Sequence, residues 1–233
     1  MVIHANGIDL YYEKTGQGSP VVLLHGNGED HTIFDGLTRR LSESFTVYAV
    51  DSRDHGRSSS VKTLYYSDMM EDTAALIRGL NLQKPALYGF SDGGIIGLLL
   101  AIQYPDMLSG LIVSGANTHP DGIKEIFFIS MKLTYFFTRS RKYKLMLTQP
   151  DIAAAGLNTI VTPVLVLAGS RDIVKEKHTK ALAANIPGSV LRILERESHA
   201  SYVVRGEKLY GILHPFLIGA QHGGEPDKKP VSS

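Results

Sequence analysis

Short runs of apolar residues, many of them β-branched, recur along this 233-residue chain and restrict its possible folds more than any other feature. Most of the runs are continuous rather than alternating with polar residues, which is typical of strands buried on both faces of a parallel sheet. Helices must then cover both faces of that sheet. The predicted strands are residues 21–24, 45–50, 86–88, 111–114, 164–168 and 190–194.

Segments with apolar residues at helical spacing lie between these runs. An alternation of strand and helix predicts a doubly wound α/β sheet. The first twelve residues differ, because Asn6-Gly7 at their centre suits the tight turn that joins two antiparallel strands. We therefore predict a mostly parallel sheet that starts with an antiparallel hairpin over residues 2–12. The predicted helices are residues 33–41, 66–80, 93–104, 175–185 and 207–217.

One connection between strands is much longer than the others. About 45 residues separate the strand that ends near Ser114 from the one that begins near Val164, and connections of this length are usually functional. We predict a helical lid inserted over residues 117–158. Residues 117–150 contain six basic and two acidic side chains. An amphipathic helical cover with a solvated basic face is favoured over a site for anionic substrates or for a membrane.

The length of the chain suits a single domain, which we place at residues 1–218. Residues 219–233 are polar and rich in Gly and Pro, so they bury too little apolar surface to order themselves, and we predict a disordered tail. The longest apolar stretch, residues 95–102, is far shorter than the roughly 20 residues of a membrane-spanning helix. The first ten residues show no signal peptide.

Composition excludes several classes of function. The net charge of +1 argues against a protein that binds nucleic acid through a strongly basic face. The absence of Cys excludes disulfides, a thiolate nucleophile and Cys-ligated metals. We expect a soluble, cytoplasmic protein that binds no nucleic acid, does not insert stably into a membrane, and is a monomer or a homodimer.

The pentapeptide Gly89-Phe90-Ser91-Asp92-Gly93 has the spacing GxSxG. A predicted strand precedes it and a Gly-rich predicted helix follows, which is the context of a nucleophile elbow. Such an elbow exposes a serine hydroxyl at the top of the sheet in a strained turn, where small flanking residues avoid clashes. By itself the pentapeptide could equally be a Gly-rich helix start that matches the pattern by chance.

A serine hydroxyl becomes an effective nucleophile only when a base removes its proton, and in this context an acid and then a histidine should follow in the chain. Asp172 and His199 each come after a predicted strand, at the carboxyl edge of the sheet. His199 would accept the proton of Ser91, while Asp172 would fix the tautomer of the imidazole. The other histidines fit this role less well, and so do the competing acids Asp106, Glu195 and Glu197.

The loop after the first buried strand, residues 25–28, reads His-Gly-Asn-Gly. Such a loop can bring a backbone N–H to the oxyanion that forms when Ser91 attacks a carbonyl. We predict the backbone N–H groups of Asn27 and Asp92 as the two donors of an oxyanion hole. A simple Gly-containing turn is the alternative interpretation of this loop.

Taken together, these motifs resemble the α/β-hydrolase superfamily over roughly residues 1–218, with an elbow most similar to small carboxylesterases and valacyclovir-hydrolase-like enzymes. The resemblance implies a mostly parallel eight-stranded sheet flanked by helices, with a short lid inserted after the sixth strand. It also implies Ser91, Asp172 and His199 as nucleophile, acid and base. One position departs from the pattern, since the family often has Gly where Asp54 stands. The matching segments are HGNG (25–28), DSRDHGRS (51–58), GFSDGG (89–94), GSRD (169–172) and ESHASY (197–202).

A serine at the elbow excludes relatives that use an aspartate nucleophile, namely epoxide hydrolases and haloalkane dehalogenases. We predict a serine esterase that cleaves small to medium carboxylic esters through an acyl-serine intermediate. A C–C bond hydrolase, a cofactor-free perhydrolase, a slow or non-catalytic ligand receptor and a scaffold without chemistry stay as alternatives. The candidate substrate-binding residues are Phe127, Phe128, Met131 and Phe136 of the lid.

We expect neither a metal nor an organic cofactor, because a serine triad supplies both the nucleophile and the base. The spacings HxH and HExxH, which are typical of zinc ligands, are absent from the sequence. The glycines at the elbow do not form a phosphate-binding loop, since Ser91 occupies the centre and Asp92 would repel a phosphate. The expected partner is a small-molecule ester.

Overall fold

The structure, a computed structural model, describes residues 1–221 and has the predicted α/β-hydrolase fold. Its described part contains one sheet with the strand order β1-β2-β4-β3-β5-β6-β7-β8. The pairs β1–β2 and β2–β4 are antiparallel, and every other neighbouring pair is parallel. The strands are β1 (Val2–Ala5), β2 (Ile8–Thr15), β3 (Pro20–Leu24), β4 (Thr46–Val50), β5 (Ala86–Phe90), β6 (Gly110–Ser114), β7 (Val164–Arg171) and β8 (Val190–Ser198).

The strands β7 and β8 extend beyond the apolar runs that predict them. The predicted strands end at residues 168 and 194, whereas β7 continues to Arg171 and β8 to Ser198. Arg171 pairs with Ser198 after an irregularity in the register between Gly169 and Arg171. Backbone pairing therefore continues where the side chains turn polar, and the residues that follow the two strands are Asp172 and His199.

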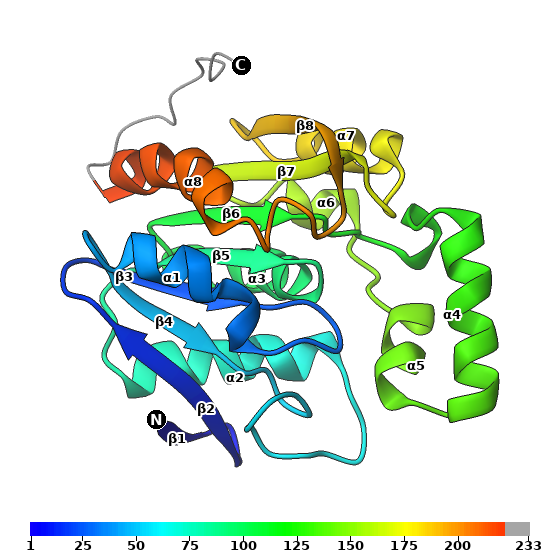
Figure 1. Cartoon of the computed structure of the whole chain (residues 1–233), viewed down its shortest axis with the longest axis horizontal. Coiled ribbons are helices and arrows are strands. Elements are labelled where there is room, and N and C mark those ends of the chain that lie inside the picture. The colour runs from blue at the N-terminus through cyan, green and yellow to red at the C-terminus, as the bar shows by residue number, and fades with distance from the viewer. Residues whose placement is uncertain (222–233) are drawn as a thin grey trace.

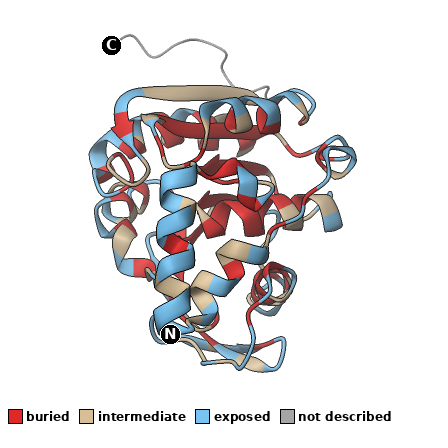
Figure 2. Cartoon of the chain, turned by 90° about the vertical axis from the view of Figure 1, so that its right-hand side faces the viewer, coloured by how far each residue is buried: buried red, intermediate tan, exposed pale blue. Residues whose placement is uncertain are grey.

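Helices cover both faces of the sheet, as Figure 1 shows. The helices α1 and α8 pack on one face, and α2 and α3 pack with α7 on the other. The continuous apolar strands β3, β4, β5 and β6 are accordingly almost fully buried (Figure 2). The helices are α1 (Asp35–Leu41, after the 3-10 turn η1, His31–Phe34), α2 (Tyr66–Gly79), α3 (Asp92–Gln103), α7 (Glu176–Ala184) and α8 (Gly206–Gln221).

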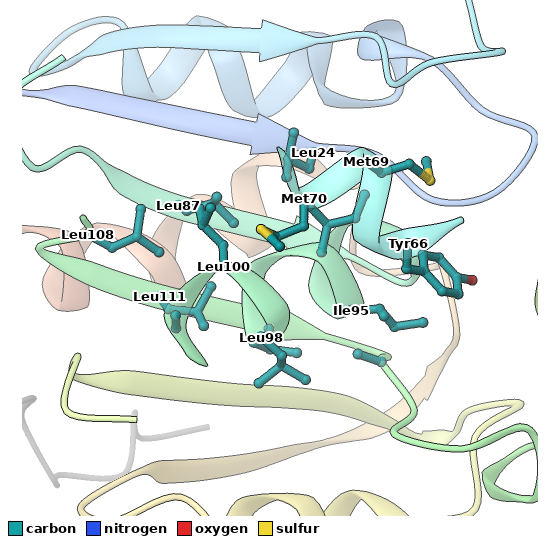
Figure 3. Packing of buried hydrophobic residues seen from close by; sticks show 14 of the residues in the cluster. Leu24, Tyr66, Met69, Met70, Leu87, Ile95, Leu98, Leu100, Leu108 and Leu111 are labelled. Carbon is teal, nitrogen blue, oxygen red and sulfur yellow. The ribbon is translucent and has the colours of Figure 1, made fainter. Parts of the chain in front are cut away.

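The larger of two apolar cores lies between the sheet and the helices α2 and α3. In Figure 3, Leu87 of β5 and Leu111 of β6 face Leu98 and Leu100 of α3, and all four are fully buried. Each such side chain stabilises the fold by about 1.5–3 kcal/mol through the removal of apolar surface from water. Because α3 begins directly after Ser91, this packing fixes the position of the elbow relative to the sheet.

The long insertion between β6 and β7 contains the 3-10 turn η2 (Pro120–Gly122) and the helices α4 (Glu125–Thr138), α5 (Arg141–Thr148) and α6 (Ala154–Leu157). It is tied to the body at both ends. The N–H of Thr118 donates to Nε2 of His178 on α7 at 2.9 Å, and the N–H of Tyr66 on α2 donates to Oε1 of Gln149 at 3.2 Å. In Figure 1, α4 stands at the outer edge of the molecule beside α5.

Asp54, the departure from the family pattern, joins the loop after β4 to the insertion. Its φ of 63° lies in the left-handed region, which explains why glycine suits this position in relatives. The side chain has three partners that a glycine would lose, because Oδ1 accepts from Ser60 Oγ and Arg141 Nη2, both at 2.8 Å, and from the N–H of Val61 at 3.4 Å. The aspartate thus adopts a less favourable backbone conformation than glycine would, but it gains an ion pair with Arg141 at the start of α5.

Residues 219–221, which the composition places in the predicted tail, belong to helix α8. Helix α8 runs to Gln221, because Ala220 still packs in the core beneath it and is only 9% exposed. Composition alone does not predict a helix over residues 219–221, but the packing of Ala220 in the core extends α8 over them. Residues 222–233, the remainder of the predicted tail, lie outside the described residues.

Two glycines of α8 give a matched test of the packing between α1 and α8. A Cβ on Gly206 would lie 2.4 Å from the carbonyl carbon of Gly36, whereas a Cβ on Gly211 would meet nothing within 4 Å. We expect Gly206→Ala to lower the free energy of unfolding by about 1–3 kcal/mol, because backbone must move apart. Gly211→Ala should raise it by about 0.5–1 kcal/mol. Urea unfolding followed by circular dichroism measures both, and equal effects of the two substitutions would contradict the close approach.

Candidate active site

Ser91 lies in the turn between β5 and α3, with φ 52° and ψ −113°. This left-handed conformation is costly for a residue with a side chain and is characteristic of functional turns. The N–H of Ser91 donates to the carbonyl oxygen of Ser114 at the end of β6 (2.7 Å). A Cβ on Gly89 or on Gly93 would lie 2.2 Å and 2.1 Å from backbone oxygens of Gly93 and Leu24, so no larger residue fits at either position.

Of the three residues predicted as a triad, His199 lies within hydrogen-bond distance of both others. Nε2 of His199 lies 3.1 Å from Oγ of Ser91, and Nδ1 of His199 lies 2.7 Å from Oδ1 of Asp172. Nδ1–H donates to the carboxylate, which leaves Nε2 free to accept from the serine hydroxyl. The imidazole packs against the ring of Phe90, with centroids 4.9 Å apart.

The carboxylate of Asp172 is held in its ionised form. It is buried, which by itself raises its pKa, but the hydrogen bond and charge of His199 and the N–H groups of Val174 and Gly169 outweigh burial and lower the pKa overall. The N–H of Val174 donates to Oδ1 at 3.0 Å. Space for the pair depends on Gly115, since a Cβ there would lie 2.8 Å from Cε1 of His199.

The two predicted oxyanion residues, Asn27 and Asp92, are joined through their side chains. Nδ2 of Asn27 donates to Oδ2 of Asp92 at 2.8 Å, and the hydroxyl of Tyr66 donates to Oδ1 of Asp92 at 2.8 Å. Burial raises the pKa of Asp92, although these two hydrogen bonds oppose the shift. The N–H of Asp92 is the first of α3, so it has no acceptor within the helix.

Two buried histidines hold the loop that carries Asn27. Nδ1–H of His25 donates to the carbonyl oxygen of Gly26 (2.7 Å), and its Nε2 accepts from the N–H of Ser52 (3.0 Å). His55 holds the far end of the same loop, because its Nε2 accepts from the N–H of Gly28 at 3.0 Å. Both bonding patterns need a neutral imidazole. Burial lowers the pKa of His25 to about 4 and also lowers the pKa of His55.

Glu29 closes the same loop from the other side. Its Oε2 accepts from the N–H of Gly26 at 2.9 Å, and its own N–H donates to the carbonyl oxygen of Gly26 at 3.3 Å. Burial raises the pKa of Glu29, which the hydrogen bond from Gly26 partly offsets. Asn27 is therefore fixed within a turn whose neighbours on both sides are hydrogen-bonded.

A pocket opens at Ser91 and His199 beneath the insertion. Of the four predicted substrate-binding residues, only Met131 lines it. Phe127 and Phe136 point into solvent, with exposed fractions of 43% and 61%, and Phe128 lies under Lys132, with Nζ 4.8 Å from the ring centroid. Phe127, Phe128 and Phe136 do not line this pocket, so their role in substrate binding stays a prediction, and Phe136 lies on the side of α4 away from Met131.

Sequence reasoning missed most of the apolar wall of this pocket. Met146 and Gln149 come from α5 and its C-cap, and Tyr66 begins α2. The others come from short irregular segments, where no periodicity points to a site. Their position follows from an antiparallel bridge between Ile123 and Val174, which brings the start of the insertion to the turn after β7. The missed lining residues are Tyr66, Gly115, Asn117, Ile123, Met146, Gln149, Ile173 and Val174.

Comparison with known families agrees with this geometry. Residues 19–145, more than half of the chain, match the family described as the alpha/beta hydrolase fold. The chain belongs to this family. It is a hydrolase of the α/β fold, and its described helices include none that is long and apolar enough to cross a membrane.

Individual relatives are more distant. The serine hydrolase BPHL of Homo sapiens is 27% identical over 250 residues, which cover 92% of this chain and 85% of the relative. The esterase EaEST of Exiguobacterium antarcticum has a similar structure, with a TM-score of 0.80, 24% identity and coverage of 94% and 99% of the two chains. The meta-cleavage product hydrolase CumD of Pseudomonas fluorescens has a TM-score of 0.76 at 17% identity, with coverage of 91% and 95%. At these identities the two structures demonstrate a common fold.

The neutral histidines that hold the loop carrying Asn27 make the stability depend on pH. Because the pKa of His25 falls from 6.5 to about 4 on folding, the unfolded chain binds more protons between these values. The free energy of unfolding is then at its full value above about pH 6.5 and falls as the pH drops toward 4, by up to about 3 kcal/mol from this residue. Urea unfolding at several pH values between 4.5 and 7.5 measures the slope.

The matched comparison is His25→Gln against His4→Gln. Glutamine keeps hydrogen-bonding capacity without titrating, so His25→Gln should flatten the dependence on pH. His4 is exposed and pairs only with Asp9 at the surface, so its substitution should leave the slope unchanged. An unchanged slope in His25→Gln would show that the buried imidazole is not the group that titrates.

Proposed function

We propose that this protein is a serine esterase that cleaves small to medium carboxylic esters. The observation that carries the proposal is the chain of hydrogen bonds from Ser91 through His199 to Asp172, with distances of 3.1 Å and 2.7 Å. A hydroxyl, a base that can accept its proton and a carboxylate that orients the base are what acyl transfer requires. Ser91, in its strained turn, is one of the residues that line the pocket.

In the first step, Oγ of Ser91 attacks the ester carbonyl carbon while Nε2 of His199 takes the hydroxyl proton. The imidazolium that forms is stabilised by the ionised carboxylate of Asp172. The backbone N–H groups of Asn27 and Asp92 are the proposed donors to the oxyanion. Since their loops are already fixed by Glu29, His25 and the bond between Asn27 and Asp92, little reorganisation accompanies charge formation.

In the second half of the reaction, the tetrahedral intermediate collapses and the alcohol leaves with the proton from Nε2 of His199. The acyl group remains on Ser91 as an ester. Water then attacks this ester, His199 takes a proton from the water, and the acid is released as Oγ recovers its proton. The chain's own residues thus balance every proton transfer, and the reaction consumes only the ester and water.

The lining of the pocket suits the binding of an acyl group of modest size. Ile123, Met131, Met146, Ile173 and Val174 form an apolar lining next to Ser91, and such linings bind hydrocarbon chains. Esterases are among the proteins to which this chain is similar in structure. The C–C bond hydrolases and perhydrolases use the same triad, so activity on esters is the property to measure directly.

The decisive experiment combines labelling with turnover. We expect a fluorophosphonate to add once, on Ser91, and p-nitrophenyl acetate, butyrate and octanoate to be hydrolysed at rates that depend on chain length. Ser91→Ala should remove the adduct and lower kcat/KM by at least about a thousandfold. Ser130→Ala, a serine on the exposed side of the insertion, is the control that should keep full activity.

Three results would contradict the proposal. Full turnover in Ser91→Ala would exclude Ser91 as nucleophile. An adduct on Ser91 without turnover of any ester would favour C–C bond cleavage or peracid formation. Neither adduct nor turnover would leave a ligand receptor or a scaffold on a hydrolase fold.

The size of the pocket can be tested at Met131. Met131→Ala removes the one side chain of α4 that is buried over the pocket, so it should raise the ratio of kcat/KM for octanoate to that for acetate several-fold. Phe127→Ala on the same helix is the control, since the Phe127 ring is exposed. The two ratios are measured with the p-nitrophenyl series. A change of equal size in both variants would place the acyl group elsewhere.

A further inference from the structure

The outer face of α4 is apolar and exposed. Sequence periodicity predicts that the apolar side chains of this segment cover the pocket while its basic face meets solvent. In the structure only Met131 of α4 is buried. Figure 2 looks onto this helix, which is largely exposed over its whole length. Five exposed apolar side chains form this face: Ile126 (73% exposed), Ile129 (63%), Leu133 (58%), Phe136 (61%) and Phe137 (74%). Phe127 (43%) is also exposed but lies on the side of the helix that carries Met131.

The spacing of these residues places them along one side of the helix. Positions three and four apart lie above one another on a helix surface, and 126, 129, 133, 136 and 137 follow this spacing. With 14 residues, α4 is about 21 Å long. An exposed apolar surface of this kind marks an interaction site in natural proteins, whereas apolar residues scattered singly do not.

The insertion that carries this face has an excess of basic side chains. Residues 117–150 contain six basic and two acidic side chains, so they carry +4 in a chain whose net charge is +1, and the rest of the sequence is at −3. The guanidinium of Arg139 lies 5.4 Å from the ring centroid of Phe136, and Nζ of Lys132 lies 4.8 Å from the ring centroid of Phe128 on the same helix. Of the two acids, Glu125 is 3.5 Å from Lys175 of the body, and Asp121 lies outside α4 beside His119.

We propose that α4 binds the surface of an anionic lipid membrane or micelle through this face. A helix with large apolar side chains on one side and flanking Lys and Arg is the pattern of helices that lie in a lipid interface. A second copy of the chain fits less well. A two-fold axis across the middle of α4 would place Lys132 beside Lys132 of the second copy, and these like charges would repel.

This surface stands next to the pocket. Met131, on the inner side of α4, lines the pocket at Ser91, while Leu133 and Phe137 on the outer side are exposed. A helix that rests on lipid through its outer side would hold the pocket close to esters dissolved in that lipid. This consequence rests on the proposed esterase function, whereas binding to the lipid surface does not.

The test is cosedimentation with vesicles. Wild-type protein should sediment with vesicles of phosphatidylglycerol and phosphatidylcholine, bind less as NaCl is raised, and bind weakly to phosphatidylcholine alone. The triple variant Ile129→Gln, Leu133→Gln, Phe137→Gln should lose about tenfold or more of this affinity. Glutamine is a good helix former, so α4 should persist, and an unchanged circular dichroism spectrum confirms the fold.

The matched control removes exposed apolar side chains elsewhere. Val161 and Val204 are 72% and 62% exposed and lie outside α4, so Val161→Gln with Val204→Gln should bind vesicles like wild type. Wild type that stays in the supernatant, or a triple variant that binds as well as wild type, would overturn the proposal. A wild-type dimer in light scattering that becomes a monomer in the triple variant would assign the face to a second copy instead.

The two proposals fail separately. Labelling of Ser91 by a fluorophosphonate in solution needs no lipid and is measured on the same variants. Vesicle binding without labelling would leave the surface and remove the esterase. Labelling and turnover of p-nitrophenyl acetate without vesicle binding would leave the esterase and remove the surface.

Discussion

The contact between two turns at the carboxyl edge of the sheet is the interaction on which the rest of the site depends. The N–H of Gly93, at the start of α3, donates to the carbonyl oxygen of His25, after β3, at 3.1 Å. Only a residue without a side chain allows this approach, since a Cβ on Gly93 would lie 2.1 Å from the carbonyl oxygen of Leu24. Because β3 and β5 are neighbours in the sheet, one hydrogen bond places the serine turn against the loop that carries Asn27.

That loop is stabilised by buried polar side chains that each accept a hydrogen bond from the backbone. A loop close to a core must satisfy its backbone N–H and C=O groups without a strand partner. Here the imidazoles of His25 and His55 and the carboxylate of Glu29 accept three backbone N–H groups, from Ser52, Gly28 and Gly26. The same solution recurs away from the site, where His178 accepts the N–H of Thr118 and anchors the insertion. Burial keeps these imidazoles neutral and therefore able to accept.

The sequence alone predicts the strands and the chain order of the candidate catalytic residues, but it does not predict where the strands end. Continuous apolar runs predict the parallel strands, and GxSxG between a strand and a helix predicts the elbow at Ser91. Asp172 and His199 follow from chain order, but their meeting depends on polar extensions of β7 and β8 that no apolar run indicates, with Arg171 opposite Ser198. The end of α8 is missed for a similar reason, because Ala220 is buried by neighbours distant in the chain.

The insertion shows why the pocket is harder to predict than the elbow. Helical periodicity states which residues share a face, but it does not state which face turns inward. Inward orientation of α4 is decided by its anchors: the hydrogen bond from the N–H of Lys124 to the carbonyl oxygen of Ile173 at its start, and the ion pair of Arg141 with Asp54 just beyond its end. Between these points a single methionine reaches the pocket, and the larger apolar side chains remain outside. Burial of apolar surface is favourable by about 25 cal/mol for each Å² removed from water. Because these side chains stay exposed in the isolated chain, a surface that covers α4 would gain this free energy on binding.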